Sequence, residues 1–145
     1  LARWSKRLGL GGPSGVDLPH EAGGLIPSPE WKLRTQKTPW YAGETVSVAI
    51  GQGQVMVTPL QMARLTALVA NGGKLVSPHL VRPQPGLTPG WAPPVDLGLK
   101  PETVAVIREG LWAVVNQGGT GWRARIDGLD VRDDVLNAAT AGVGR

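Results

Sequence analysis

Two stretches of the chain carry the hydrophobic spacing of amphipathic helices, residues 59–70 and 101–116. In the first, only three positions are polar, so we expect a helix that is buried on most of its sides. Thr58, Pro59 and Gln61 predict its start, because a threonine N-cap, a proline in the first turn and a glutamine reaching back form a capping box. The second stretch places its large apolar residues on one face: Val104, Ile107, Leu111, Val114 and Val115.

Shorter elements are predicted around these helices. Residues 45–50 alternate apolar and polar side chains, which predicts a half-buried strand, and residues 51–53 (Gly-Gln-Gly) then predict a turn. Residues 1–10 have the pattern of a helix end that stops at a glycine. Ser28 predicts the N-cap of a short basic helix, because a proline and a glutamate follow it.

The composition favours long connections over a large core. Of the 145 residues, 21 are glycine and 13 are proline, a share close to that of loop-rich chains. Residues 82–98 hold five of these prolines and predict a surface loop. Residues 74–81 predict a short strand that Pro78 interrupts, and a further short segment is expected over residues 126–131.

Charge and residue usage exclude several kinds of site. The net charge of +4 permits binding to nucleic acid, but no nucleic-acid-binding motif is present and the cations are dispersed, which favours solvated helix faces. The absence of cysteine excludes disulfides and thiol chemistry. The six tryptophans are scattered, so we expect them to anchor loops and not to form a ligand platform. The cation clusters are Arg3, Lys6 and Arg7; Lys32, Arg34 and Lys37; and Arg123, Arg125 and Arg132.

A series of short motifs follows one order along most of the chain. They are Gly15–Gly24 (GVDLPHEAGG), Pro27–Lys32 (PSPEWK), Pro39–Thr45 (PWYAGET), Ile50–Gly53 (IGQG), Val57–Gln61 (VTPLQ), Asn71–Lys74 (NGGK), Pro78–Leu80 (PHL), Gly110–Asn116 (GLWAVVN) and Gly118–Gly121 (GGTG). This series resembles the transpeptidase domain of class B penicillin-binding proteins, and among them penicillin-binding protein 2 of cell elongation, with His20 where the family has glycine. Many ordered matches are more specific than any single short motif.

The resemblance implies an α+β fold: a partial penicillin-binding domain of the serine β-lactamase-like type, with helices, loops and an incomplete antiparallel sheet. It implies that residues 1–131 are the C-terminal part of that domain, and that residues 132–145 form a divergent tail. The intact parent would cross-link peptidoglycan stem peptides and be acylated by β-lactams. It would lie at the periplasmic face of the inner membrane, with proteins of the elongation complex as possible partners and with no cofactor, metal or nucleic acid.

The three catalytic motifs of that family are not present in this chain. The family acylates the serine of an S-x-x-K motif, with the help of an S-x-N motif and a K-[ST]-G strand. None of the five serines begins either serine motif, and no lysine precedes Thr-Gly or Ser-Gly. We therefore predict no catalytic residue here. The serines are Ser5, Ser14, Ser28, Ser47 and Ser77.

Two explanations for this absence stay open. The chain is either a fragment of a transpeptidase or a non-catalytic remnant or scaffold that binds a partner of the elongation complex. A frameshift, a rearrangement or a misjoined gene end would each produce the junction at residue 132. The chain shows no signal peptide and no membrane helix, in keeping with a missing N-terminal part.

Single polar residues offer weaker candidates for a site. His20 and His79 have no partner at a spacing typical of zinc ligands. Two acidic pairs, Asp17 with Glu21 and Asp133 with Asp134, have the residue type for acid–base chemistry, but turn stabilisation is the favoured role. The turns at residues 51–53 and 118–121 lack the lysine and the frame of a phosphate-binding loop.

Overall fold

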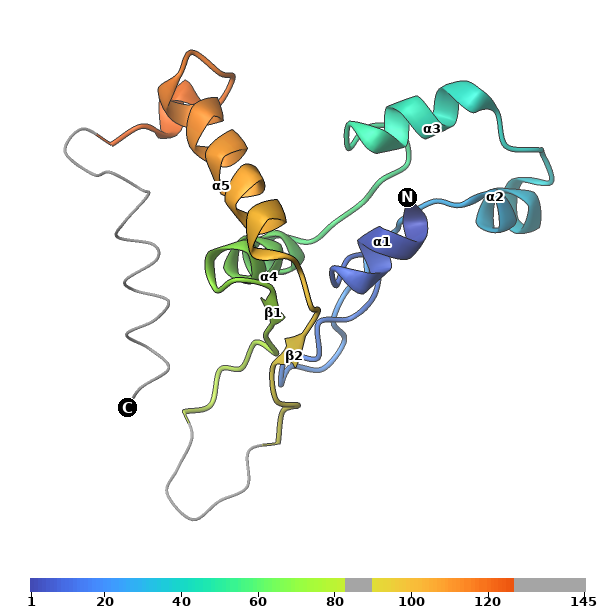
Figure 1. The fold of residues 1–145 in the computed structure, drawn as a ribbon. Coiled ribbons are helices and arrows are strands. Elements are labelled where there is room, and N and C mark those ends of the chain that lie inside the picture. Colours follow the sequence, from blue (N-terminus) through green and yellow to red (C-terminus); the bar gives the residue numbers. More distant parts are fainter. Residues whose placement is uncertain (83–89, 127–145) are drawn as a thin grey trace. The chain divides into compact units, whose positions relative to one another are not determined.

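A computed structural model describes residues 1–82 and 90–126 of the chain (Figure 1). Its elements are α1 (Ala2–Arg7), α2 (Pro29–Gln36), α3 (Ala42–Ala49), α4 (Pro59–Ala70), β1 (Lys74–Leu75), β2 (Val95–Asp96), α5 (Pro101–Asn116) and the 3₁₀ helix η1 (Trp122–Ala124). The chain divides into two compact units. Unit 1 is Leu1–Leu65 with Ser77–Pro93, and unit 2 is Thr66–Val76 with the chain from Pro94 onward.

In its described residues, unit 1 contains three short helices, the first turns of α4 and the loops that join them. Ser28 caps α2 as predicted, because its hydroxyl accepts a hydrogen bond of 3.2 Å from the N–H of Trp31. An isolated antiparallel bridge joins Leu25 to Met56, through hydrogen bonds of 2.6 and 2.9 Å. Ile26 is buried beside this bridge. Loops therefore supply much of this unit, as the glycine and proline content indicates.

The strand predicted over residues 45–50 is wrong, because residues 45–49 belong to helix α3 and Ile50 is its C-cap. Glu44 accounts for the difference: its carboxylate accepts a hydrogen bond of 2.7 Å from the N–H of Tyr41 and so caps the first turn. The alternating pattern also does not correspond to a half-buried face, since Val46 and Ile50 are 65% and 70% exposed. Local capping therefore outweighs the period-two pattern here.

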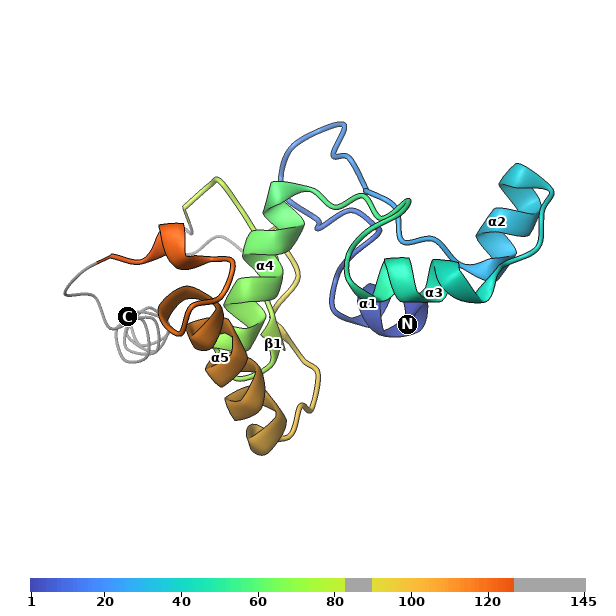
Figure 2. The ribbon, with the colours of Figure 1, turned by 90° about the horizontal axis from the view of Figure 1, so that it is seen from above.

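Unit 2 combines the last turns of α4, a two-stranded sheet and α5. The sheet pairs Lys74 with Asp96 and Leu75 with Val95 in antiparallel register. Figure 2 shows α5 beside the end of α4, where Arg108 donates hydrogen bonds of 3.1 and 2.6 Å to the carbonyls of Val69 and Ala70. The guanidinium thus satisfies carbonyls that the end of α4 leaves free. The buried apolar residues are Leu68, Val69, Leu97 and Val104.

The helices over 59–70 and 101–116 begin and end where the sequence predicts, and the α+β class with a small antiparallel sheet is confirmed. The expectation that α4 is buried on most sides is wrong. Met62 is 44% exposed, whereas the polar Gln61 is 1% exposed. The strand predicted over 74–81 is limited to Lys74–Leu75, and residues 127–131 of the last predicted segment lie outside the described residues.

The apolar face of α5 is largely uncovered. Val104 is buried, but Ile107, Leu111 and Val114 are 40%, 51% and 44% exposed. A large apolar side chain contributes about 1.5–3 kcal/mol only when it is fully buried, so Ile107, Leu111 and Val114 contribute less to stability than Val104 does. Within the described ranges, no helix has both the length and the apolar content that crossing a membrane requires.

Candidate functional site

Three described serine hydroxyls, those of Ser5, Ser28 and Ser47, contact the main chain. Ser5 and Ser47 donate to carbonyls one helical turn earlier, at 3.4 and 3.2 Å, and Ser28 caps α2. Ser14 is buried, and its N–H, like that of Gly15, donates to the carboxylate of Glu21. No hydrogen bond joins a serine hydroxyl to a lysine within residues 1–82 and 90–126, and the absence of a nucleophile stays a prediction.

The buried side chain of Gln61 connects three parts of unit 1. Its Nε2 donates hydrogen bonds of 2.7 Å to the carbonyl of Gly12 and 2.8 Å to that of Gly23. Its Oε1 accepts 3.1 Å from the N–H of Thr58, and its own N–H donates 3.1 Å to the Thr58 hydroxyl. The predicted capping box is thereby confirmed. The same amide also fixes a loop 38 to 49 residues earlier in the chain, a contact that a local capping pattern does not predict.

Gly24 lies next to Met56 and Gln61, where no larger residue fits. Its φ is +67°, and a Cβ atom would lie 2.5 Å from the Met56 carbonyl oxygen and 3.0 Å from Oε1 of Gln61. Both the backbone conformation and the close approach therefore require glycine. Together, Gly24 and Gln61 hold the loop before residue 25 against the start of α4.

Asp17 holds the segment after Pro78 in unit 1. Its two carboxylate oxygens accept hydrogen bonds of 2.8 Å from the N–H of Leu80 and 3.1 Å from that of Val81. These two N–H groups lower the pKa of the Asp17 carboxyl below its ordinary value, since they stabilise the charged form. The sequence predicts that Asp17 stabilises the turn in which it lies, but the segment that it holds is 63 and 64 residues away in sequence.

Glu21 stabilises the loop in which it lies. Its carboxylate accepts 2.7 Å from the N–H of Ser14 and 3.1 Å from that of Gly15. Partial desolvation alone would raise the pKa of this carboxyl, but the hydrogen bonds from the loop outweigh it and lower the pKa. Asp17 and Glu21 therefore bind separate pairs of N–H groups, and they do not form an acid–base pair.

An ion pair joins α2 to α3. Nζ of Lys32 lies 2.7 Å from Oε2 of Glu44, and it also lies 4.5 Å from the centre of the Tyr41 ring. Lys32 is only 6% exposed, so this contact is shielded from solvent on the lysine side. The hydrogen bond from Lys32, followed by that from the N–H of Tyr41, lowers the pKa of the Glu44 carboxyl. The cluster in the sequence predicts a freely solvated cation at Lys32. This prediction is wrong, because Lys32 is buried and paired with Glu44.

The two histidines do not come together at a metal site. His20 is exposed with a φ of 61°, and His79 stacks on Trp91 with 4.0 Å between ring centres and 4° between planes. Within the part of the chain that the structure describes, no three potential metal ligands are grouped. Asp133 and Asp134 lie outside those residues. The site formed here is accordingly a set of hydrogen bonds that position loops.

Known proteins are similar to this chain in both sequence and fold. The family model for the penicillin binding protein transpeptidase domain matches residues 1–132. The peptidoglycan D,D-transpeptidase MrdA of Acinetobacter baumannii is 40% identical over 145 residues, which are 100% of this chain and 19% of that protein. The chain thus spans about a fifth of that curated relative.

Two solved structures agree. The crystal structure of Pseudomonas aeruginosa PBP2 in complex with WCK 5153 has a TM-score of 0.74 at 38% identity, over 84% of this chain and 28% of that one. A chain in the complex between PBP2 and MreC from Helicobacter pylori has a TM-score of 0.72 at 32% identity, over 85% of this chain and 22% of that one. The chain therefore belongs to the penicillin-binding protein transpeptidase domain family.

Proposed function

We propose that this chain is a segment of a peptidoglycan D,D-transpeptidase of the penicillin-binding protein 2 type. The observation that carries the proposal is the family match over residues 1–132, together with 40% identity to a named D,D-transpeptidase. Residues 1–131 would form the C-terminal part of the domain, and residues 132–145 a divergent tail. The parent would act at the periplasmic face of the inner membrane.

In the parent, a serine outside this segment would attack the D-Ala-D-Ala end of a stem peptide and release D-Ala. An amine of a neighbouring stem peptide would then attack the acyl group on the serine, which forms the cross-link and frees the serine. β-Lactams would acylate the same serine. The role proposed for this segment is positional: Gln61, Gly24 and Asp17 would hold loops of the domain in place.

A chimaera tests this proposal. Residues 1–131 would replace the corresponding segment of the Acinetobacter baumannii enzyme, leaving the host's catalytic motifs intact. If the segment is a working part of such a domain, a labelled penicillin should acylate the chimaera stoichiometrically, as it acylates the host. A folded chimaera that stays unlabelled would contradict the proposal, and its circular dichroism spectrum would show that it is folded.

A non-catalytic remnant or scaffold that binds a protein of the elongation complex is the second candidate. The supporting observation is that the Helicobacter pylori relative forms a complex with MreC. Pull-down of the chain with an MreC protein, alongside the chimaera, would separate the two candidates. Binding by the chain together with an inactive folded chimaera would favour the scaffold.

A further inference from the structure

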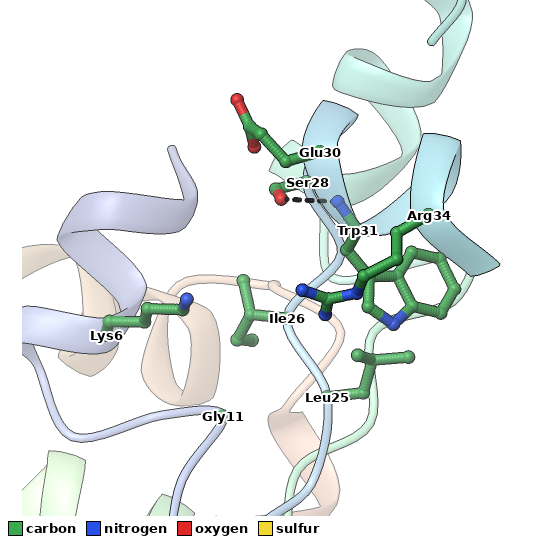
Figure 3. Close-up of a pocket in the computed structure, with 8 residues that line it drawn as sticks. All are labelled: Lys6, Gly11, Leu25, Ile26, Ser28, Glu30, Trp31 and Arg34. Carbon is green, nitrogen blue, oxygen red and sulfur yellow. Dashed lines mark hydrogen bonds between the residues drawn. The ribbon is translucent and has the colours of Figure 1, made fainter. Parts of the chain in front are cut away.

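Two basic clusters that are far apart in the sequence contribute to one pocket of unit 1. Lys6 comes from α1 and Arg34 from α2, and between them lies a pocket of about 330 Å³ (Figure 3). Sequence patterns favour solvated helix faces for both clusters, so this juxtaposition is a product of the fold. The residues that line the pocket are Lys6, Gly11, Leu25, Ile26, Ser28, Glu30, Trp31 and Arg34.

The charged groups of this pocket favour an anion. In Figure 3 the ammonium of Lys6 and the guanidinium of Arg34 lie on opposite sides of Ile26, and the Glu30 carboxylate points away from Ile26. Lys6 interacts electrostatically with Glu30, so the lining has two cations against one carboxylate. Neither cation forms an ion pair within 4.0 Å in the described ranges, whereas the neighbouring Lys32 is paired with Glu44. A planar guanidinium binds carboxylates through two parallel hydrogen bonds, and an ammonium adds a point charge.

Besides the polar Ser28 and Glu30, the rest of the lining is apolar, and Leu25 and Ile26 form its floor. Ile26 is 6% exposed, and Leu25 is held by its two backbone hydrogen bonds to Met56. Gly11 lies close to this floor, with a φ of +74°, and a Cβ there would lie 2.7 Å from Cγ1 of Ile26. The indole of Trp31 forms a further wall (Figure 3). The pocket therefore presents an apolar surface next to two cationic groups, without needing to rearrange.

We propose that this pocket binds a peptide carboxylate that lies next to an aliphatic side chain. The carboxylate would contact Lys6 and Arg34, and the aliphatic group would pack on Leu25, Ile26 and the Trp31 ring. A concave site of this size suits a discrete group better than the flat surface of a membrane. The inference does not depend on the reaction proposed above, because it uses none of the parent's catalytic groups.

Titration of the ¹⁵N-labelled chimaera, in which the segment has the rest of its domain around it, with acetyl-leucine tests the proposal. The six tryptophans of the segment each give an indole N–H signal, and the Trp31→Phe variant identifies the one that reports on the pocket. We expect a saturable shift of this signal, with the signal of Trp122 unchanged. Acetyl-leucinamide, which lacks the charge, should bind roughly tenfold more weakly, as should acetyl-glycine, which lacks the aliphatic side chain.

Matched variants assign the binding to the two cations. Arg34→Gln and Lys6→Gln should each weaken acetyl-leucine binding roughly three- to tenfold, and Arg34→Lys should weaken it less than Arg34→Gln. Lys37→Gln and Arg3→Gln remove a charge from the same clusters outside the pocket and should leave binding unchanged. Equal losses of acetyl-leucine binding in all four glutamine variants would overturn the proposal, since they would indicate a non-specific electrostatic attraction to the net positive charge.

Two further results would also overturn it. One is the absence of a saturable shift up to ~50 mM acetyl-leucine, which is well above the millimolar affinity that such a small ligand can reach. The other is binding of the chain to anionic phosphatidylglycerol vesicles with no response to acetyl-leucine. That second result would assign the basic residues to a membrane-facing surface.

Discussion

Replacement of Gln61 by alanine should destabilise the fold more than replacement of any one exposed side chain by alanine. Gln61 is 1% exposed and its side chain makes three hydrogen bonds, to Gly12, Gly23 and Thr58. Each hydrogen bond contributes about 1 kcal/mol net, and more when its loss leaves a buried group unsatisfied. We therefore expect a loss of about 3 kcal/mol from a domain stability of about 5–15 kcal/mol.

The chimaera with the Acinetobacter baumannii enzyme is the proper host for this measurement, because the isolated chain is expected to be marginally stable. The shift in Tm per kcal/mol becomes smaller as the domain grows, because the entropy of unfolding rises with its length. Scanning calorimetry should therefore show Gln61→Ala melting about 3–5 °C below the parent chimaera. Amide exchange of Leu25, whose N–H is bonded to Met56, should become faster, since the loop loses its anchor.

Two controls test the reasoning. Gln61→Glu keeps the side-chain length and can still accept from Thr58, but it cannot donate to the two glycine carbonyls. It should therefore be at least as destabilising as alanine. Gln52→Ala removes an exposed side chain and should change Tm by less than about 2 °C. A Gln61→Ala chimaera that melts within that same range would refute the argument.

Three further outcomes are expected. Asp17→Asn should speed amide exchange at Leu80 and Val81 near neutral pH. Because folding lowers the pKa of Asp17, the wild-type carboxylate protects the Leu80 and Val81 amides fully at pH values above its ordinary pKa of about 3.9. This protection is lost as the pH falls through the lowered pKa. An Asp17→Asn variant with unchanged amide exchange would contradict this role. A labelled penicillin should leave no covalent adduct on the isolated chain, and a stoichiometric acyl-enzyme by mass spectrometry would show that a nucleophile was overlooked. The isolated chain should also be marginally stable and prone to aggregate, since Ile107, Leu111 and Val114 are exposed; a sharp, monomeric near-ultraviolet circular dichroism transition above about 55 °C would show instead that it is self-sufficient.

Local sequence signals predicted the elements that local interactions determine. Helices α4 and α5 have the predicted bounds, and Ser28 and Thr58 form the expected caps. These signals were sufficient because helix periodicity and capping involve residues within four positions of each other. These signals did not predict helix α3, since one capping carboxylate, that of Glu44, outweighed an alternating pattern.

Contacts between distant residues could not be predicted in the same way. The capping pattern identified Gln61, but nothing local indicates that its amide also reaches Gly12 and Gly23. The burial of Gln61 would have indicated these contacts, but this burial is known only from the folded structure. Lys6 and Arg34 likewise belong to separate clusters in the sequence, and only folding brings them to one pocket.

The division of unit 1 into Leu1–Leu65 and Ser77–Pro93 has a consequence for folding during synthesis. The carboxylate of Asp17 finds its partners 63 and 64 residues later, so this contact cannot form until the ribosome has released residue 81. Contacts of such long sequence separation slow folding, because the entropy of closing the loop is lost before any contact forms. The first 65 residues therefore emerge as a nascent chain that must wait for its completion, and this interval is when a chaperone would have access to its exposed apolar side chains.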